Sequence, residues 1–247
     1  MDAAAWYSYF YPETIDPQTG NGTLRNLKGI RDPEILENYT NSRAAFRMAQ
    51  LFKNPIAGGF DYAHMKAIHY HLFQDVYEWA GQERIVSMQK AGHGYWPAGP
   101  GLAEAANKQY ALIPSTVIAH RHDPQAFING LGECWCEINV VHSFREGNTR
   151  SQFVFFHQLA AHCGWQLNTQ PFAEGADLRE AFVQARFFGQ RTGQSAPLSR
   201  VLAQALYPTD HVPPLTAHEV AILSKTVPRP DHSSHPARQY HDYGRDL

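Results

Sequence analysis

The chain has 247 residues, 43% of them hydrophobic and 18% charged, and a formal net charge of −2. This length and composition fit one globular domain with a sizeable core, and the near-neutral charge without basic runs argues against nucleic acid as a partner. No apolar stretch reaches the length of a membrane span and the first residues lack the pattern of a signal peptide, so we expect a cytoplasmic protein without membrane contact.

The N-terminal third of the chain predicts an irregular segment followed by two helices. The first thirty residues are rich in Pro, Gly, Asn and Thr, which favour turns. A helix is predicted from about 33 to 52, because Asp32 can cap it and Pro33 suits its first position. A second helix is predicted over 61–79, where apolar side chains recur at helical spacing: Met65, Ile68, Leu72, Val76 and Trp79.

Glycines and prolines between 80 and 100 interrupt this helical pattern. They bracket a short segment of strand propensity, residues 84–88, which residues 91–94 can turn back toward Tyr95 and Trp96, so we predict a small β-hairpin. Further helices are predicted at about 101–119 and 123–142, after Gly147, and at 177–192 and 197–206. The fold class is therefore mainly α, with one small hairpin.

Residues 207–247 differ in composition from the rest of the chain. They hold six prolines and few large apolar groups, too little apolar surface to offset the entropy lost on ordering. We therefore predict one domain over residues 1–206 and a disordered tail over 207–247. The tail histidines are too irregularly spaced to favour a metal site: His211, His218, His232, His235 and His241.

The three cysteines, Cys134, Cys136 and Cys163, indicate free thiols. Their odd number and their spacing fit neither a disulfide framework nor a standard zinc site.

The most informative stretch joins two predicted helices at residues 142–150. His142 ends an apolar stripe at the C-terminal end of the first helix, and a second apolar helix begins near Asn148, which we expect to be its N-cap residue. Backbone N–H groups at a helix N-terminus attract anions, Gly147 allows close approach, and Arg150 adds a charged donor. The stretch therefore predicts a phosphate site.

Two more side chains in this stretch suit a reaction at a bound phosphate. Glu146 could share a magnesium ion with the phosphate oxygens, and His142 lies across the loop as a general base for a hydroxyl group. A lone histidine on an apolar helix face is usually a core residue, and a Glu-Gly-Asn turn is usually only a turn. Their occurrence together within nine residues favours the functional interpretation.

The stretch His142-x-Phe144-x-Glu146-Gly147-Asn148-x-Arg150 resembles the signature of Fic-domain proteins, His-x-Phe-x-Asp/Glu-Gly-Asn-Gly/Lys-Arg. Residues 72–81 resemble the segment that leads into the Fic flap hairpin. Residues 16–20 and 26–30 resemble the N-terminal region of Fic toxins paired with small antitoxins. The resemblance covers about residues 7–206 and implies a Fic-type helical bundle with a β-hairpin flap.

Fic proteins mostly transfer AMP from Mg-ATP to a Ser, Thr or Tyr hydroxyl of a target protein. The resemblance implies that His142 deprotonates this hydroxyl, that Phe144 anchors the loop and that Glu146 ligates magnesium. It further implies an anion hole and a phosphate ligand, formed by Gly147, Asn148, Thr149 and Arg150. The hairpin, residues 84–96, would dock the target by strand addition, through Ile85, Val86, Ser87, Met88 and Trp96.

Two residues depart from the family pattern. Thr149 stands where glycine is common, and its β-branch narrows the backbone geometry. Phe153 stands where active members usually carry a second arginine, which meets the ATP γ-phosphate and pairs with the inhibitory glutamate of regulated members. The inhibitory motif Ser/Thr-x-x-x-Glu-Gly/Asn is absent: Glu37-Asn38 has Pro33 four residues before the Glu, and Glu174-Gly175 has Gln170 there. We therefore expect no inhibitory helix in cis and consider a small antitoxin in trans.

Three functions remain open at this point. The first is a protein adenylyltransferase, as the toxin of a toxin–antitoxin pair or otherwise. The second is a Fic enzyme that uses another nucleotide or transfers phosphate as in the Doc branch, which has Ala-Asn-Lys where this chain keeps Glu146 and Gly147. The third is a degenerate module that binds without catalysis, which Thr149 and Phe153 favour and the intact His142 opposes.

Overall fold

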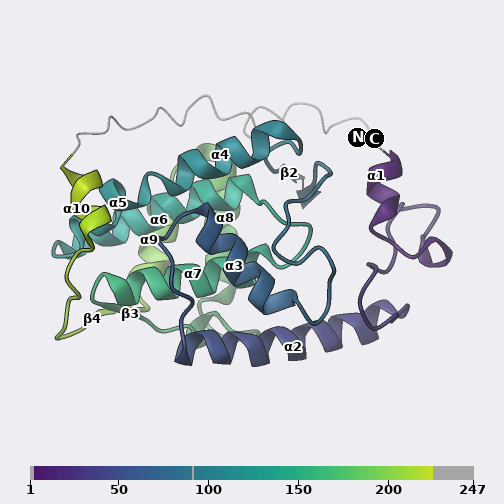
Figure 1. The fold of residues 1–247 in the computed structure, drawn as a ribbon, viewed down its shortest axis with the longest axis horizontal. Helices are drawn as coiled ribbons and strands as arrows, with labels where there is room; N and C mark the ends of the chain where they lie inside the picture. Colours follow the sequence, from purple (N-terminus) through teal and green to yellow (C-terminus); the bar gives the residue numbers. More distant parts are fainter. Residues whose placement is uncertain (1–2, 91, 225–247) are drawn as a thin grey trace.

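The computed structural model describes residues 3–90 and 92–224, which form a helical bundle with two small β-pairs (Figure 1). The helices are α1 (Ala3–Ser8), α2 (Pro33–Lys53), α3 (Tyr62–Phe73), α4 (Pro100–Tyr110), α5 (Ile113–Thr116), α6 (Pro124–Val141), α7 (Asn148–His162), α8 (Arg179–Thr192), α9 (Ala196–Ala203) and α10 (Ala217–Leu223). The strands are β1 (Gln89–Lys90), β2 (His93–Gly94), β3 (Trp165–Leu167) and β4 (Leu206–Pro208), and three short 3-10 helices cover Pro12–Thr14, Ile118–His120 and Gln170–Phe172. The predicted mainly α fold class is confirmed.

Helix α6 is the centre of the bundle. Twelve of its 18 residues are buried, and α4, α7, α8 and α9 all pack against it. Its Trp135 is fully buried, stacks on Phe156 of α7 with ring centroids 4.4 Å apart, and meets the edge of Phe182 of α8 at 5.3 Å. This aromatic contact fixes how α7 and α8 lie against α6.

Aspartate caps start the helices that bring the site together. The side chains of Asp32, Asp61 and Asp123 each accept a hydrogen bond from the backbone N–H three residues further on, at 2.8 to 3.1 Å. The predicted helix over 33–52 is therefore confirmed as α2, and the start of the predicted helix at 61 is confirmed as α3.

The second half of the predicted helix over 61–79 is wrong. Helix α3 ends at Phe73, and the chain turns so that the Val76 N–H donates to the Phe73 carbonyl at 2.9 Å. Asp75 holds this turn, because Arg43 and Arg47 of α2 both reach its carboxylate at 2.8 Å. An ion pair with a distant helix thus outweighs the helical apolar spacing.

The hairpin exists, but its predicted strand over 84–88 is wrong. The paired residues are β1 and β2, in the antiparallel register Gln89↔Gly94 and Lys90↔His93. Residues 84–88 are instead tied to the α6–α7 junction, where the Arg84 N–H donates to the Ser143 carbonyl at 2.9 Å.

The predicted helix over 101–119 is broken in two. Pro114 lacks the N–H that would continue α4, so α4 ends at Tyr110 and the short α5 follows. The predicted helices over 123–142, 177–192 and 197–206 correspond to α6, α8 and α9, and α9 ends early because Leu206 enters β4.

The predicted disorder of the tail is wrong for residues 207–224. Strand β4 pairs with β3, Thr216 and Glu219 form a capping box that starts α10, and the buried Glu219 accepts from His162 of α7 at 2.7 Å. Figure 1 places α10 and the β3–β4 pair at one end of the bundle, and α1 and the hairpin at the other. The rest of the predicted tail, residues 225–247, lies outside the described residues.

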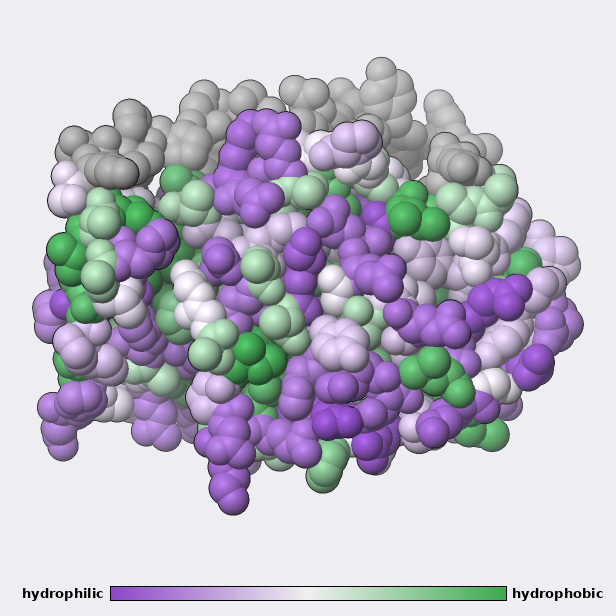
Figure 2. Space-filling view, in the orientation of Figure 1, coloured by the Kyte–Doolittle hydropathy of each residue, from purple (hydrophilic) through white to green (hydrophobic). Residues whose placement is uncertain are grey.

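The surface and the thiols agree with the composition. Hydrophobic side chains lie in small groups among hydrophilic ones on the face drawn in Figure 2. No helix within residues 3–90 and 92–224 has the length and apolar character needed to cross a membrane. Cys134, Cys136 and Cys163 are buried and form no disulfide with one another, as predicted.

We predict that Glu219→Ala destabilises the domain, because it leaves a buried part of α10 without its contact to α7. The expected cost is about 1–3 kcal/mol, or several degrees in Tm. Thermal unfolding measured by circular dichroism checks this. The exposed Glu174→Ala is the control and should leave Tm unchanged. Equal Tm values for the two variants would contradict the docking of α10.

Candidate functional site

The junction of α6 and α7 gives His142 an unusual backbone. His142 terminates α6 in the left-handed region, with φ 48° and ψ 58°, and its N–H donates to the Ile138 carbonyl at 3.2 Å. Among the described residues other than glycine, Phe60 alone shares a positive φ. Such a conformation is costly for a residue with a side chain and concentrates at functional sites.

Arg84 fixes this junction to the hairpin segment. Its Nε donates to the His142 carbonyl at 2.8 Å, and its other nitrogens donate to the carbonyls of Val86, Trp96 and Val141. The guanidinium is buried, and a cation at the C-terminus of α6 suits the helix dipole. Burial lowers the Arg84 pKa to about 10, which still leaves the group charged near neutral pH.

Asn148 gives the loop its shape. Its Oδ1 accepts from the Phe144 N–H at 2.9 Å, and its Nδ2 donates to the Phe144 carbonyl at 2.7 Å. The prediction that Asn148 is the N-cap of α7 is wrong: Gly147 occupies that position, with φ 81°, because the Asn148 side chain is engaged within the loop. Phe144 itself is buried, as the resemblance implies for a loop anchor.

His69 of α3 packs against the same loop. It stacks on Phe144 with ring centroids 3.8 Å apart. Its Nδ1 accepts from the Gly81 N–H at 2.8 Å, so Nε2 carries the proton and donates to the Glu146 carbonyl at 2.9 Å. Burial lowers the His69 pKa to about 3, so the ring stays neutral and both bonds persist.

The start of α7 brings Gly147, Glu146 and Arg150 together, as predicted. A Cβ on Gly147 would lie 2.3 Å from the Phe73 ring, so the chain approaches that ring as only glycine can. Arg150 donates to Glu146 Oε1 at 3.3 Å and to Oδ1 of Asn41 on α2 at 2.8 Å. These contacts hold a guanidinium beside the N-terminal N–H groups of α7.

Glu146 is the carboxylate through which this site could hold a divalent cation. Its side chain is 45% exposed, and its Oε1 accepts from the Gly147 N–H at 2.8 Å. Within the described chain no group of three or more His, Cys, Asp or Glu side chains could hold a metal ion. A magnesium ion here would therefore take further ligands from phosphate oxygens and water, which is its usual coordination beside a nucleotide.

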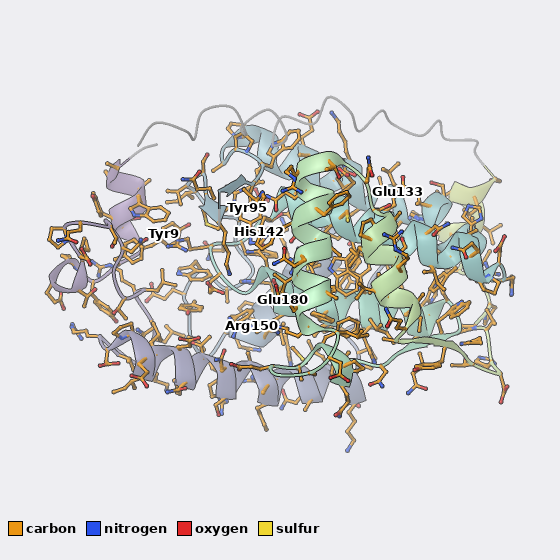
Figure 3. The ribbon with its side chains drawn as sticks, turned by 180° about the vertical axis from the view of Figure 1, so that it is seen from behind. Tyr9, Tyr95, Glu133, His142, Arg150 and Glu180 are labelled. Carbon is orange, nitrogen blue, oxygen red and sulfur yellow. The ribbon has the colours of Figure 1, made fainter. Side chains whose placement is uncertain are left out.

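The His142 ring lies beneath the hairpin and remains partly accessible. Tyr95, which follows β2, stacks on it with ring centroids 3.7 Å apart, and Figure 3 shows the two side chains together with Arg150 on the α2 side. Burial lowers the pKa of His142 well below its ordinary value, and the positive charges of Arg186 and Arg84 lower it further. His142 is therefore neutral near pH 7 and able to accept a proton.

The residues predicted to dock a target are placed unevenly. Ile85 is 61% exposed, whereas Val86 is buried and cannot meet a target, so that part of the prediction is wrong. Ser87, Met88 and Trp96 are partly exposed, and the Trp96 backbone is tied to the Val140 carbonyl of α6 at 2.9 Å. The exposed paired strand is β1 instead.

The two departures in the motif both face α8. Thr149 Oγ1 accepts a hydrogen bond from Arg186 at 3.2 Å. The Phe153 ring packs in an aromatic cluster with Trp135, Phe172 and Phe182.

The sequence did not predict three residues of the site: Arg84, His69 and Arg186. Each lies outside the motif and contributes through contacts with distant parts of the chain.

The family model for Fic/DOC matches residues 59–160. Probable protein adenylyltransferase y4lH of Sinorhizobium fredii is 35% identical over 195 residues, which cover 78% of this chain and 98% of that protein. Probable protein adenylyltransferase Fic of Escherichia coli K12 is 30% identical over 206 residues, covering 80% and 92%. Protein adenylyltransferase VbhT of Bartonella schoenbuchensis is 32% identical over 194 residues, but these span 38% of it.

Solved structures agree on the fold. BepC, a VirB-translocated effector protein of Bartonella tribocorum solved with bound AMPPNP, superposes with a TM-score of 0.69 at 21% identity. The match covers 83% of this chain and 98% of that one.

We predict that Gly147→Ala destabilises the protein more than Gly175→Ala. Both glycines have a positive φ, near 80° and 75°, so both variants carry a backbone penalty of about 1–2 kcal/mol. Only at Gly147 would the new methyl group also strike Phe73, whereas nothing lies within 4 Å at Gly175. Overpacking adds about 1–3 kcal/mol. Urea unfolding of both variants measures the difference, and equal losses would contradict the close approach of Phe73.

Proposed function

The chain belongs to the Fic/DOC family, and on this premise we propose that it is a protein adenylyltransferase, which transfers AMP from Mg-ATP to a Ser, Thr or Tyr hydroxyl of a target protein. The observation that carries the proposal is the neutral His142 ring, held by its left-handed backbone beside the N-terminus of α7. A base and an anion site that meet across one short loop suit attack by a hydroxyl on a phosphate.

In the proposed reaction His142 accepts the proton of the target hydroxyl. The freed oxygen bonds to the α-phosphorus of ATP while the bond from that phosphorus to the β-phosphate oxygen breaks, so that AMP remains on the target and pyrophosphate leaves. The N–H groups at the start of α7 and the Arg150 guanidinium face the charge that develops on the phosphate oxygens. Positioning and charge neutralisation supply most of the acceleration in such a transfer.

Glu146 is the residue proposed to hold magnesium. Its exposed carboxylate at the loop fits an ion that also binds the phosphates. The ion would neutralise charge on the phosphate chain.

The proposed target contact is the edge of the hairpin. Gln89 and Lys90 of β1 are exposed, and their backbone can accept an extended segment as an added strand. The hairpin is anchored behind them, because Gln190 of α8 donates to the Gly94 carbonyl at 2.6 Å. A target held at this edge would lie close in the chain to Tyr95, which follows β2 and stacks on His142.

The proposed regulation is in trans. The motif of an inhibitory helix is absent from the sequence, and residues 16–20 and 26–30 resemble Fic toxins that pair with small antitoxins. We therefore propose a small antitoxin as a partner, and the cytoplasm, where ATP is available, as the site of the reaction.

Transfer of label from ATP tests the activity. The protein is incubated in bacterial lysate with Mg-ATP labelled at the α- or the γ-phosphate. We expect α-label on protein, reduced by at least about 100-fold in His142→Ala, as for loss of a general base. His157→Ala, which removes another partly buried histidine of α7, is the control and should keep activity.

Two results would contradict the proposal. Transfer of γ-label alone would indicate phosphorylation, and absence of any transfer by the folded protein would argue for a binding module.

The pH dependence of transfer gives an independent prediction. Because the His142 pKa lies well below its ordinary value of about 6.5, the base stays deprotonated as the pH falls through that value. The rate of transfer should therefore hold steady from pH 8 to about pH 6.5 and decline only at lower pH. A rate that halves near pH 6.5 or above would show that His142 titrates normally.

A further inference from the structure

Arg186 of α8 is a buried cation with unusual partners. It is 8% exposed, and within residues 3–90 and 92–224 it forms no ion pair with a carboxylate. Its donors meet three neutral oxygens instead: Asn139 Oδ1, Thr149 Oγ1 at 3.2 Å and Gln152 Oε1 at 3.3 Å. A buried guanidinium without a counter-charge is costly, because neutral acceptors replace only part of its hydration.

The guanidinium lies beside the anion-binding end of α7. Thr149 and Gln152 belong to the first five residues of that helix, whose N–H groups carry partial positive charge. The Nε of Arg186 has no hydrogen-bond partner in the described chain. Arg186 reaches α7 from α8, since its guanidinium donates to Thr149 Oγ1 and to Gln152 Oε1.

Phe153 lies one turn after Thr149 on the same face of α7. Its ring packs on Phe182 of α8, with centroids 4.8 Å apart, and the Arg186 guanidinium lies over that Phe182 ring at 5.1 Å. The face of α7 that carries Thr149 and Phe153 is thus lined by rings, and the positive charge beside it comes from α8.

We propose that Arg186 is the second phosphate-binding cation of this site and acts on the β- and γ-phosphates of ATP, in place of an arginine at position 153. The proposal rests on the proposed function, since it concerns the same nucleotide site. Thr149 belongs to the same arrangement, because its hydroxyl receives one guanidinium N–H that a glycine would leave without that partner. We therefore treat Thr149, Phe153 and Arg186 as parts of one phosphate-binding arrangement between α7 and α8.

The lowered pKa of His142 agrees with this placement, because Arg186 is the largest charge contribution to it. Arg186 thus lies close enough to the base to act on the charges around it. A bound phosphate chain would supply the counter-charge that the guanidinium lacks among the described carboxylates.

Titration calorimetry of nucleotide binding, with magnesium present and no target protein, tests the proposal. Arg186→Gln should weaken binding of ATP and of ADP at least about 10-fold, because a charge-assisted bond to phosphate is lost. Binding of AMP, which lacks the β- and γ-phosphates, should change less than about 3-fold. Arg191→Gln on the same helix is the matched control, since Arg191 is exposed and outside the site.

An Arg186→Gln protein with unchanged ATP affinity, or with equal losses for ATP and AMP, would overturn the proposal. Arg186→Lys is the second variant in case the neutral one does not fold, because it keeps the charge in the same space. It should retain the preference for ATP over AMP, and loss of that preference in the folded lysine variant would also overturn the proposal.

These outcomes are separable from failure of the proposed function. A wild-type protein that binds ATP but transfers no label refutes the transferase while leaving the role of Arg186 testable. If the wild-type protein transfers AMP and the Arg186→Gln protein binds ATP normally, only the proposed role of Arg186 in phosphate binding is refuted.

Discussion

The two hydrogen bonds between the Asn148 side chain and the Phe144 backbone are the constraint on which the rest of the site depends. They close the loop between α6 and α7 into a fixed turn, and the buried Phe144 ring ties that turn to His69 beneath it. The Asn148 side chain is therefore not available to cap α7, and the first N–H groups of α7 can meet a ligand. The shape of the loop also sets where Glu146 lies.

Positive charge surrounds a neutral base in this protein. Arg84 holds the backbone of His142 from the hairpin side, Arg150 lies at the start of α7, and Arg186 approaches from α8. Arg84 is buried against carbonyls at the C-terminus of α6, which suit a cation. Arg186 is buried and bonded to neutral side-chain oxygens, an arrangement that costs stability until an anion arrives. Burial lowers the pKa of His142, and the charges of Arg186 and Arg84 lower it further, so the base stays deprotonated. A phosphate site and a proton acceptor thus result from one electrostatic arrangement.

Short-range signals in the sequence predict part of this arrangement well. Asp32, Asp61 and Asp123 act as caps through a bond three residues away, so the helix starts are predictable from local sequence. The stretch from His142 to Arg150 is contiguous, so its residues come together whatever the rest of the fold does. Arg84, His69 and Arg186 lie 37 to 77 residues from their partners in that loop, and no local pattern marks them. The errors at Val86 and residues 207–224 have the same cause, because tertiary contacts there decide what the local sequence leaves open. The error at Asn148 is local, because its side chain bonds to the Phe144 backbone within the loop instead of capping α7.

The central claim is that the α-phosphate of ATP lies at the start of α7 within reach of His142. A crystal structure of the protein with magnesium and a non-hydrolysable ATP analogue tests it most directly. The account predicts the α-phosphate on the α7 N–H groups, with its phosphorus facing the His142 ring and the terminal phosphates between Arg150 and Arg186. A nucleotide bound in the reverse sense, with the γ-phosphate beside His142, would contradict it.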